Sequence, residues 1–140
     1  MLPAGAVPAE VVGVTDGDTL TAIVNGRQIK VRLNGIDAPE KKQAFGNASK
    51  RALSDLVFGQ RVSIVPLGKD RWGRTIAEVF TGDRQRVGLV MVRQGMAWHF
   101  VKYAPADILL ADAEKEARAG KRGLWADAAP VSPWEWRTKR

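Results

Sequence analysis

The chain has 140 residues, the size of one domain, and its 22 lysines and arginines against 15 aspartates and glutamates give a formal net charge of +7. It has no cysteine, which excludes disulfides and thiolate metal sites, and no run of about 18 apolar residues that could span a membrane. A basic balance of this kind favours a polyanionic partner such as nucleic acid, although a merely solubilising surface would have the same composition.

The first third of the chain reads as β structure. A short β-branched run over 11–14 is followed by two β-rich segments, over 20–24 and 27–33, which are joined by Asn25 and Gly26. An Asn-Gly pair between two such runs predicts a β-hairpin. Apolar and basic residues alternate along the second arm, so one face of that strand is predicted to be apolar and the other basic.

A helical period replaces the alternation over 47–58, and Gly59 is suited to end that helix. Strands are predicted over 61–67 and 75–80, with a loop over 68–73 between them. The middle of the chain therefore contributes one helix and two more strands.

Two further helices are predicted over 84–93 and 107–119, with Gly95 and Gly120 expected to end them, and a short extended piece over 97–101 lies between them. The strands are short and hairpin-linked, which predicts the α+β class, with a five-stranded Greek-key β-barrel of the OB-fold type and about three helices.

We expect three parts in the chain: an N-terminal extension over 1–10, the OB-fold domain over 11–125, and a basic, Trp-containing C-terminal tail over 126–140 that is irregular. The tail tryptophans are expected to pack on the body, the alternative being stacking on bases. Its final basic residues would attract phosphate diffusely or form a solvated end; they are Arg137, Lys139 and Arg140.

Two acidic turns stand out in this basic protein: "TDGDTL" over 15–20 and "GIDAPE" over 35–40. Asp18 precedes the first hairpin strand and Asp37 follows the second, so the two carboxylates are predicted to lie side by side. Two adjacent carboxylates share a proton unless a cation lies between them, and a hard divalent cation such as Ca²⁺ or Mg²⁺ suits oxygen ligands. Pro39 favours an extended Ala38, whose carbonyl could be a third ligand. Simple turn capping is the alternative.

Arginines and one more carboxylate accompany these turns. Arg32 lies on the basic face of the hairpin, and Arg74 ends the loop that contains "DRWGR". Guanidinium groups bind phosphate in bidentate fashion, and Glu40 would be free to take a proton from water. Each residue alone could form an exposed ion pair worth about 0–1 kcal/mol. Together with the acidic turns they favour a phosphodiester substrate.

Several separate motifs, in order over 11–125, resemble those of the staphylococcal nuclease (thermonuclease) family. They are "DGDT" over 16–19, "VRLNGIDAPE" over 31–40, "DRWGR" over 70–74, "VRQGMA" over 92–97 and "GLW" over 123–125. The resemblance implies an OB-fold barrel with three helices. It also implies a Ca²⁺-dependent phosphodiesterase that acts on DNA and RNA and leaves 3′-phosphates.

The resemblance assigns roles to individual residues. Asp18 and Asp37 would bind Ca²⁺ through their side chains and Ala38 through its main-chain carbonyl, while Glu40 would be the general base. The remaining assignments are Arg32 and Arg74 to the scissile phosphate, and Asp16 and Thr19 to support of the metal ligands.

The nucleotide pocket that the resemblance implies differs in part. Tyr103 matches one pocket tyrosine of the best-known family member, Val101 stands in place of another, and Trp72 replaces a third and could stack on a base. Arg71, beside Trp72, is assigned to the substrate as well.

The sequence leaves one alternative function, a non-catalytic OB-fold module that binds nucleic acid, although such a module would not need Glu40. His99 is the only histidine, which excludes a two-histidine ribonuclease mechanism and favours a structural role for that ring. We expect a monomer whose partners are DNA and RNA, with single strands preferred. If a leader has been removed, a secreted or periplasmic location is favoured.

Overall fold

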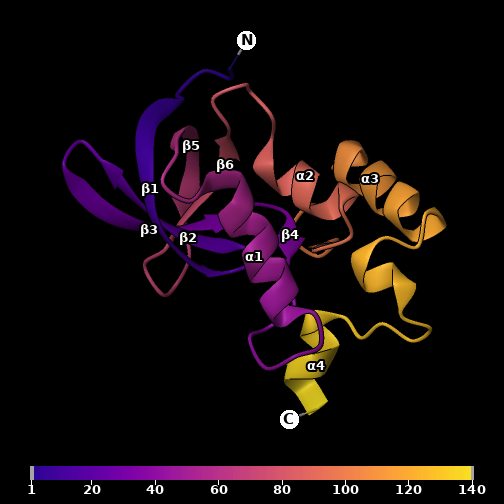
Figure 1. Cartoon of the computed structure of the whole chain (residues 1–140). Helices are drawn as coiled ribbons and strands as arrows, with labels where there is room; N and C mark the ends of the chain where they lie inside the picture. Colours follow the sequence, from indigo (N-terminus) through magenta and orange to yellow (C-terminus); the bar gives the residue numbers. More distant parts are fainter. Residues whose placement is uncertain (1, 140) are drawn as a thin grey trace.

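Five strands close into a barrel in the order β1-β2-β3-β6-β5 (Figure 1). The structure is a computed structural model that describes residues 2–139. Neighbouring strands are antiparallel except β3 and β6, which are parallel. The predicted α+β class and five-stranded OB-type barrel are confirmed. The strands are β1 (Val7–Asp16), β2 (Thr19–Val24), β3 (Arg27–Leu33), β5 (Arg61–Lys69) and β6 (Thr75–Phe80).

The predicted hairpin joins β2 to β3. Asn25 and Gly26 both have positive φ, 50° and 76°, as a type I′ turn requires. Val24 pairs with Arg27 next to the turn, and Thr19 pairs with Arg32 at the open end. This register places both acidic turns at the same end of the barrel.

A second, two-stranded sheet lies beside that end. It pairs β4 (Ile36–Asp37) with β7 (Trp98–His99), and Asp37 lies opposite Trp98. The short extended piece predicted over 97–101 thus has a definite partner. The pairing fixes the second acidic turn to the body of the protein.

Four α-helices and one 3₁₀-helix surround the barrel in the described residues 2–139, one α-helix more than predicted. None of these helices is long and apolar enough to cross a membrane. The bounds are α1 (Gly46–Val57), α2 (Val87–Arg93), α3 (Ile108–Ala119), η1 (Gly123–Ala126) and α4 (Pro133–Lys139).

The prediction that the tail is irregular is wrong for α4. Ser132 begins this helix, because its Oγ accepts a hydrogen bond from the Glu135 backbone N–H at 3.3 Å and donates to the Glu135 carboxylate at 2.7 Å. The Ser132 hydroxyl thus caps the helix, and Pro133 occupies the first helical position, where its missing N–H costs nothing. The sequence "SPWE" over 132–135 is therefore the local signal for the start of this helix.

The largest differences from the predicted boundaries are at the starts of β1 and α2. Strand β1 begins at Val7 instead of residue 11, because its first four residues pair with β5, with Val7 opposite Ile64. Helix α2 begins at Val87 instead of residue 84, because Arg84 has a positive φ of 66° in a tight turn closed between Thr81 and Gln85.

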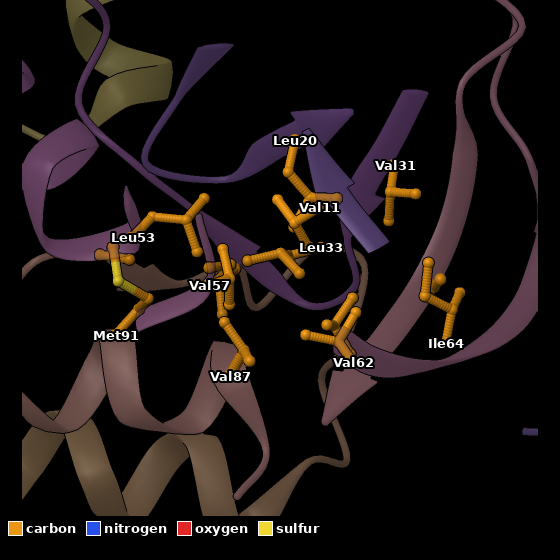
Figure 2. Close-up of a cluster of buried hydrophobic side chains, with 14 of the residues drawn as sticks. Val11, Leu20, Val31, Leu33, Leu53, Val57, Val62, Ile64, Val87 and Met91 are labelled. Carbon is orange, nitrogen blue, oxygen red and sulfur yellow. The ribbon is translucent and has the colours of Figure 1, made fainter. Parts of the chain in front are cut away.

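One continuous core joins the barrel to the helices. Figure 2 shows Leu20 and Leu33 of the barrel in the same cluster as Leu53 of α1 and Met91 of α2. All four side chains are buried. A second cluster forms around Trp98 and Trp125, with Trp134 of α4 packed against it. The tail is therefore packed on the body, as expected for its tryptophans.

The end of α2 meets η1 through two glycines in backbone contact. Gly95 has a φ of 75°, and a side chain there would lie 2.2 Å from the Arg122 carbonyl oxygen. A Cβ at Gly123 would lie 2.4 Å from the Gly95 carbonyl oxygen, which accepts a hydrogen bond from the Leu124 N–H at 2.9 Å. Only glycine allows this approach.

Candidate active site

Two buried carboxylates face one guanidinium at the end of the barrel. Arg32 Nη2 lies 3.5 Å from Asp18 Oδ2 and 3.5 Å from Asp37 Oδ1, and the two aspartate side chains are only 8% and 2% exposed. The structure brings Asp18 and Asp37 together, as the hairpin geometry predicts. Burial of two carboxylates in one place requires compensating positive charge.

Asp18 is held by hydrogen bonds at both oxygens. The Thr19 hydroxyl donates to Oδ1 at 2.9 Å and the Ala38 backbone N–H donates to Oδ2 at 2.8 Å. Burial alone would raise the pKa of Asp18, but the Arg32 charge and these hydrogen bonds outweigh burial, so its pKa lies below the usual range. Asp18 is therefore held as a carboxylate.

The pKa of Asp16 is shifted in the opposite direction. Its Oδ1 accepts a hydrogen bond from the Asp18 backbone N–H at 3.1 Å. Burial first, and then the charge of Asp18, raise the pKa of Asp16 to about 7. Since neighbouring carboxylates disfavour each other's ionisation, Asp16 is the more readily protonated of the two.

Gly17 lies between these two aspartates because nothing larger fits. A Cβ there would lie 1.8 Å from the Ser49 Oγ and 2.8 Å from the Ala38 Cβ. Ser49, on α1, is fixed by donating its hydroxyl to the Met96 carbonyl at 2.7 Å. The first acidic turn therefore packs directly against α1 and against the second acidic turn.

Arg32 is fixed by the backbone as well as by the acids. Its Nη1 donates to the carbonyl oxygens of Leu33 and Ile36, both at 2.8 Å. One arm of the guanidinium thus ties the turn between β3 and β4, while the other arm faces the two carboxylates. This leaves little freedom to reorient the side chain.

Glu40 lies on the second acidic turn, and its side chain is 26% exposed. Its backbone N–H donates to Gln43 Oε1 at 3.1 Å. The amide nitrogen of the same Gln43 donates to the Val131 carbonyl at 2.7 Å. Gln43 therefore connects the turn that carries Glu40 to the C-terminal segment.

A second arginine at the site comes from the tail. Arg137 Nη2 lies 2.6 Å from Asp37 Oδ2, and its Nη1 lies 3.7 Å from Glu40 Oε2. The expectation that Arg137 belongs to a diffusely charged or solvated end is wrong. Lys139, further along, is exposed, whereas Arg140 lies outside the described residues. The helix signal at Ser132 is the sequence feature that could have drawn attention to this residue.

The pKa of Asp37 depends on its burial, on Asp18 and on both arginines. Burial is the main effect and raises its pKa, and the charge of Asp18 acts in the same direction. The hydrogen bond from Arg137 and the charge of Arg32 oppose the rise without cancelling it. Asp37 is therefore the less acidic member of the pair.

The other predicted substrate residues lie on β6 and its loop. Arg74 precedes β6, which runs parallel to β3 with Thr75 opposite Val31, and its Nε is paired with Asp70 Oδ2 at 2.6 Å. Trp72 is 67% exposed, and the Arg71 guanidinium lies over its ring at 4.5 Å.

Tyr103 is also 67% exposed, and its ring meets Phe100 edge-to-face at 4.8 Å. His99 is buried, and its Nε2 lies 2.7 Å from the Ala104 carbonyl. These contacts agree with the structural role expected for the histidine, and they leave Tyr103 open to a ligand.

Comparison with known proteins shows the family of the chain. The family model described as "Staphylococcal nuclease homologue" matches residues 30–127. The chain belongs to the staphylococcal nuclease family. It is 50% identical over 128 residues to "Uncharacterized endonuclease" of Haemophilus influenzae (91% of this chain, 71% of the relative). It is 42% identical over 137 residues to "Micrococcal nuclease" of Shigella flexneri (91% and 79%), and 41% identical over 134 residues to "Uncharacterized endonuclease" of Escherichia coli O157:H7 (96% and 87%).

The donor set of this staphylococcal nuclease family member is compatible with a hard divalent cation. Asp18 and Asp37 present facing carboxylate oxygens, and the backbone of Ala38 lies against Asp18. Residues 2–139 contain no group of three or more His, Cys, Asp or Glu side chains arranged for a metal. A cation bound here would have these two carboxylates as acidic ligands, and carbonyl or water oxygens would complete its shell.

Proposed function

We propose that this protein is a Ca²⁺-dependent nuclease that hydrolyses the phosphodiester bonds of DNA and RNA with little sequence preference. The observation that carries the proposal is the pair of buried carboxylates, Asp18 and Asp37, opposed across the Arg32 guanidinium. Membership of the staphylococcal nuclease family and the printed names of its endonuclease and nuclease relatives support hydrolysis of nucleic acid.

Asp18, Asp37 and the Ala38 carbonyl would hold Ca²⁺, which when bound supplies positive charge to the oxygens of the scissile phosphate. Thr19 keeps Asp18 oriented through its hydroxyl. The protein's own contribution is to hold these oxygens in a fixed arrangement, buried away from bulk water.

Arg32 and Arg74 bind the phosphate and stabilise the charge that develops during in-line attack. Arg32 can do so with Nη2, because its Nη1 is already bonded to two carbonyls. Arg74 would exchange its ion pair with Asp70 for a phosphate oxygen. Glu40 accepts a proton from the attacking water as its oxygen bonds to phosphorus. The bond from phosphorus to the 5′ oxygen breaks, and this oxygen takes a proton from solvent and leaves as a hydroxyl, so that the other product carries a 3′-phosphate.

The substrate surface is suited to unpaired nucleotides. Trp72 and Tyr103 are exposed aromatic rings on which a base could stack, and this requires bases that are free of a duplex. Contacts to phosphate carry no base information, so weak sequence preference and a preference for single strands are expected.

The decisive experiment measures cleavage of single-stranded DNA, double-stranded DNA and RNA with Ca²⁺ and with a chelator. Cleavage should require Ca²⁺. Glu40→Gln should keep binding but lose about 10²–10⁴ in kcat, the usual contribution of a positioned base. Glu116→Gln, which changes an exposed carboxylate on α3, is the matched control and should be unaffected.

Full activity of Glu40→Gln would refute the assigned base. Binding of nucleic acid without cleavage under any of these conditions would instead favour the non-catalytic binding module.

A further inference from the structure

We propose that Arg137 is a positioning residue of this active site, and that helix α4 is therefore part of the catalytic unit. In this role the guanidinium fixes the orientation of the Asp37 carboxylate, and through it the arrangement of the oxygens offered to the cation. This inference rests on the proposed function, because it assigns Asp37 to the cation.

The Arg137 guanidinium contacts the buried Asp37 carboxylate through both of its terminal nitrogens, as a fork. Arg137 Nη2 lies 2.6 Å from Asp37 Oδ2, and Nη1 lies 3.4 Å from Oδ1. The Asp37 side chain is only 2% exposed with Arg137 in place, so the carboxylate receives these bonds in a site largely shielded from water. A charge-assisted hydrogen bond in such a place is strong and restricts rotation of the carboxylate.

The Asp37 oxygen that Arg137 contacts most closely indicates that Arg137 orients the carboxylate and does not block the proposed cation site. The short contact is made to Oδ2, whereas Oδ1 is the oxygen that shares the Arg32 Nη2 with Asp18. Arg137 therefore makes its close contact with Oδ2 and only a longer contact, at 3.4 Å, with Oδ1, the oxygen that faces Arg32. Carboxylates that bind metals are commonly held by a hydrogen bond at their other oxygen, and loss of that bond weakens metal binding.

Helix α4 is placed by contacts other than this ion pair. The Trp134 ring stacks on Phe100 with centroids 5.2 Å apart and an interplanar angle of 5°, and it meets Trp98 edge-to-face at 5.4 Å. Trp98 lies opposite Asp37 in the small sheet. The anchor of α4 and the target of its arginine therefore belong to the same pair of strands.

A second connection supports the same conclusion. Gln43 accepts from the Glu40 N–H and donates to the Val131 carbonyl, at 3.1 and 2.7 Å. The C-terminal segment thus contacts the turn of the proposed base through Gln43 and the proposed metal ligand through Arg137. One segment, more than 80 residues away in sequence, supports both.

The first test measures Ca²⁺ binding by calorimetry, without nucleic acid. Arg137→Gln should weaken binding by about tenfold or more, the usual effect of losing a residue that orients a ligand. Lys139→Gln removes the same charge from an exposed position of the same helix and should leave the affinity unchanged. Unchanged or tighter Ca²⁺ binding by Arg137→Gln would overturn the proposal, the latter because it would mean that the guanidinium competes with the cation.

The second test needs no metal. In a chelator, Arg137→Gln should lower the melting temperature of the otherwise unchanged protein and have little effect in the Asp37→Asn background. Equal losses in both backgrounds would overturn the coupling. If the protein neither binds Ca²⁺ nor cleaves nucleic acid, the proposed function fails, while this cycle still reports whether Arg137 holds Asp37.

The third test separates positioning from general attraction of phosphate. Arg137→Gln should lower kcat more than it raises KM, and Arg137→Lys, which keeps the charge but not the fork, should restore only part of the loss. Trp134→Ala removes the anchor and not the guanidinium, and it should weaken Ca²⁺ binding in the same direction. A pure rise in KM, shared by Lys139→Gln, would assign Arg137 to diffuse attraction instead.

Discussion

At the scale of single residues, the arginines near the site differ in how firmly they are held. Arg32 donates to two backbone carbonyls and faces two buried carboxylates, whereas Arg74 has an ion pair with Asp70 in an exposed loop. The first is built into the fold, and the second is available to exchange its partner. We therefore expect Arg32 to contribute more to the stability of the fold than Arg74.

Conservative replacement should reveal this difference. Arg32→Lys keeps the charge but leaves the Leu33 and Ile36 carbonyls without their donor, and it should reduce the free energy of unfolding by about 1–3 kcal/mol. Arg74→Lys disturbs a partly exposed pair at the edge of a loop and should cost less, about 1 kcal/mol. Urea denaturation in a chelator measures both, and equal small losses would contradict the structural role of Arg32.

At the scale of elements, α3 is attached to the barrel through Asp107, the residue that caps its N-terminus. Asp107 caps the helix by accepting from the Leu110 N–H at 3.1 Å, and it also pairs with Arg86 at 2.6 Å. Arg86 reaches Glu78 on β6 at 3.0 Å, so one guanidinium joins a strand to a helix. Burial opposes ionisation of Asp107, but the bonds from Arg86 and Leu110 outweigh it and its pKa lies below the usual range.

Asp107→Ala should therefore lower the free energy of unfolding by about 1–3 kcal/mol at pH 7, through the lost cap and the unpaired arginine. Asp112→Ala, at an exposed position of the same helix, should change it by less than about 0.5 kcal/mol. Because the folded pKa is depressed, the stabilisation by Asp107 is present above its unfolded value of 3.8 and is lost as the pH falls through the folded value. The difference between wild type and Asp107→Ala should thus shrink at pH 3. An undiminished difference there would contradict the ionic part of the argument.

At the scale of the whole molecule, segments from the beginning and the end of the chain meet at the candidate active site. The acidic turns come from the first third of the chain, and Arg137 comes from its last few residues (Figure 1). The surface as a whole is basic, with a formal net charge of +7. A buried acidic site on a basic protein suits the proposed reaction, in which a polyanion approaches carboxylates that would hold a cation.

Binding of nucleic acid should consequently depend on salt. The affinity of Glu40→Gln for single-stranded DNA should fall steeply between 50 and 200 mM salt, because each phosphate contact releases a counterion. Fluorescence anisotropy of a labelled oligonucleotide measures it. A flat response would argue against a phosphate-dominated interface.

Much of the architecture was predictable because it depends on neighbours in sequence. The alternation along β3, the Asn25–Gly26 turn and the helical stripe of α1 are local patterns, and they predicted the barrel and its hairpin. The approach of Asp18 to Asp37 followed as well, since the open end of a hairpin brings its two flanks together. Family motifs in the same turns pointed to the same residues.

The sequence by itself thus determined the barrel and the acidic pair, whereas the tertiary structure decided what surrounds them. The capping signal at Ser132 can be read locally, but nothing local states where α4 docks. Arg137 meets Asp37 across 100 residues because Trp134 fits against Phe100 and Trp98, a matter of packed shapes. Hydrophobic period and turn chemistry act over a few residues, and contacts between distant segments depend on how whole elements pack.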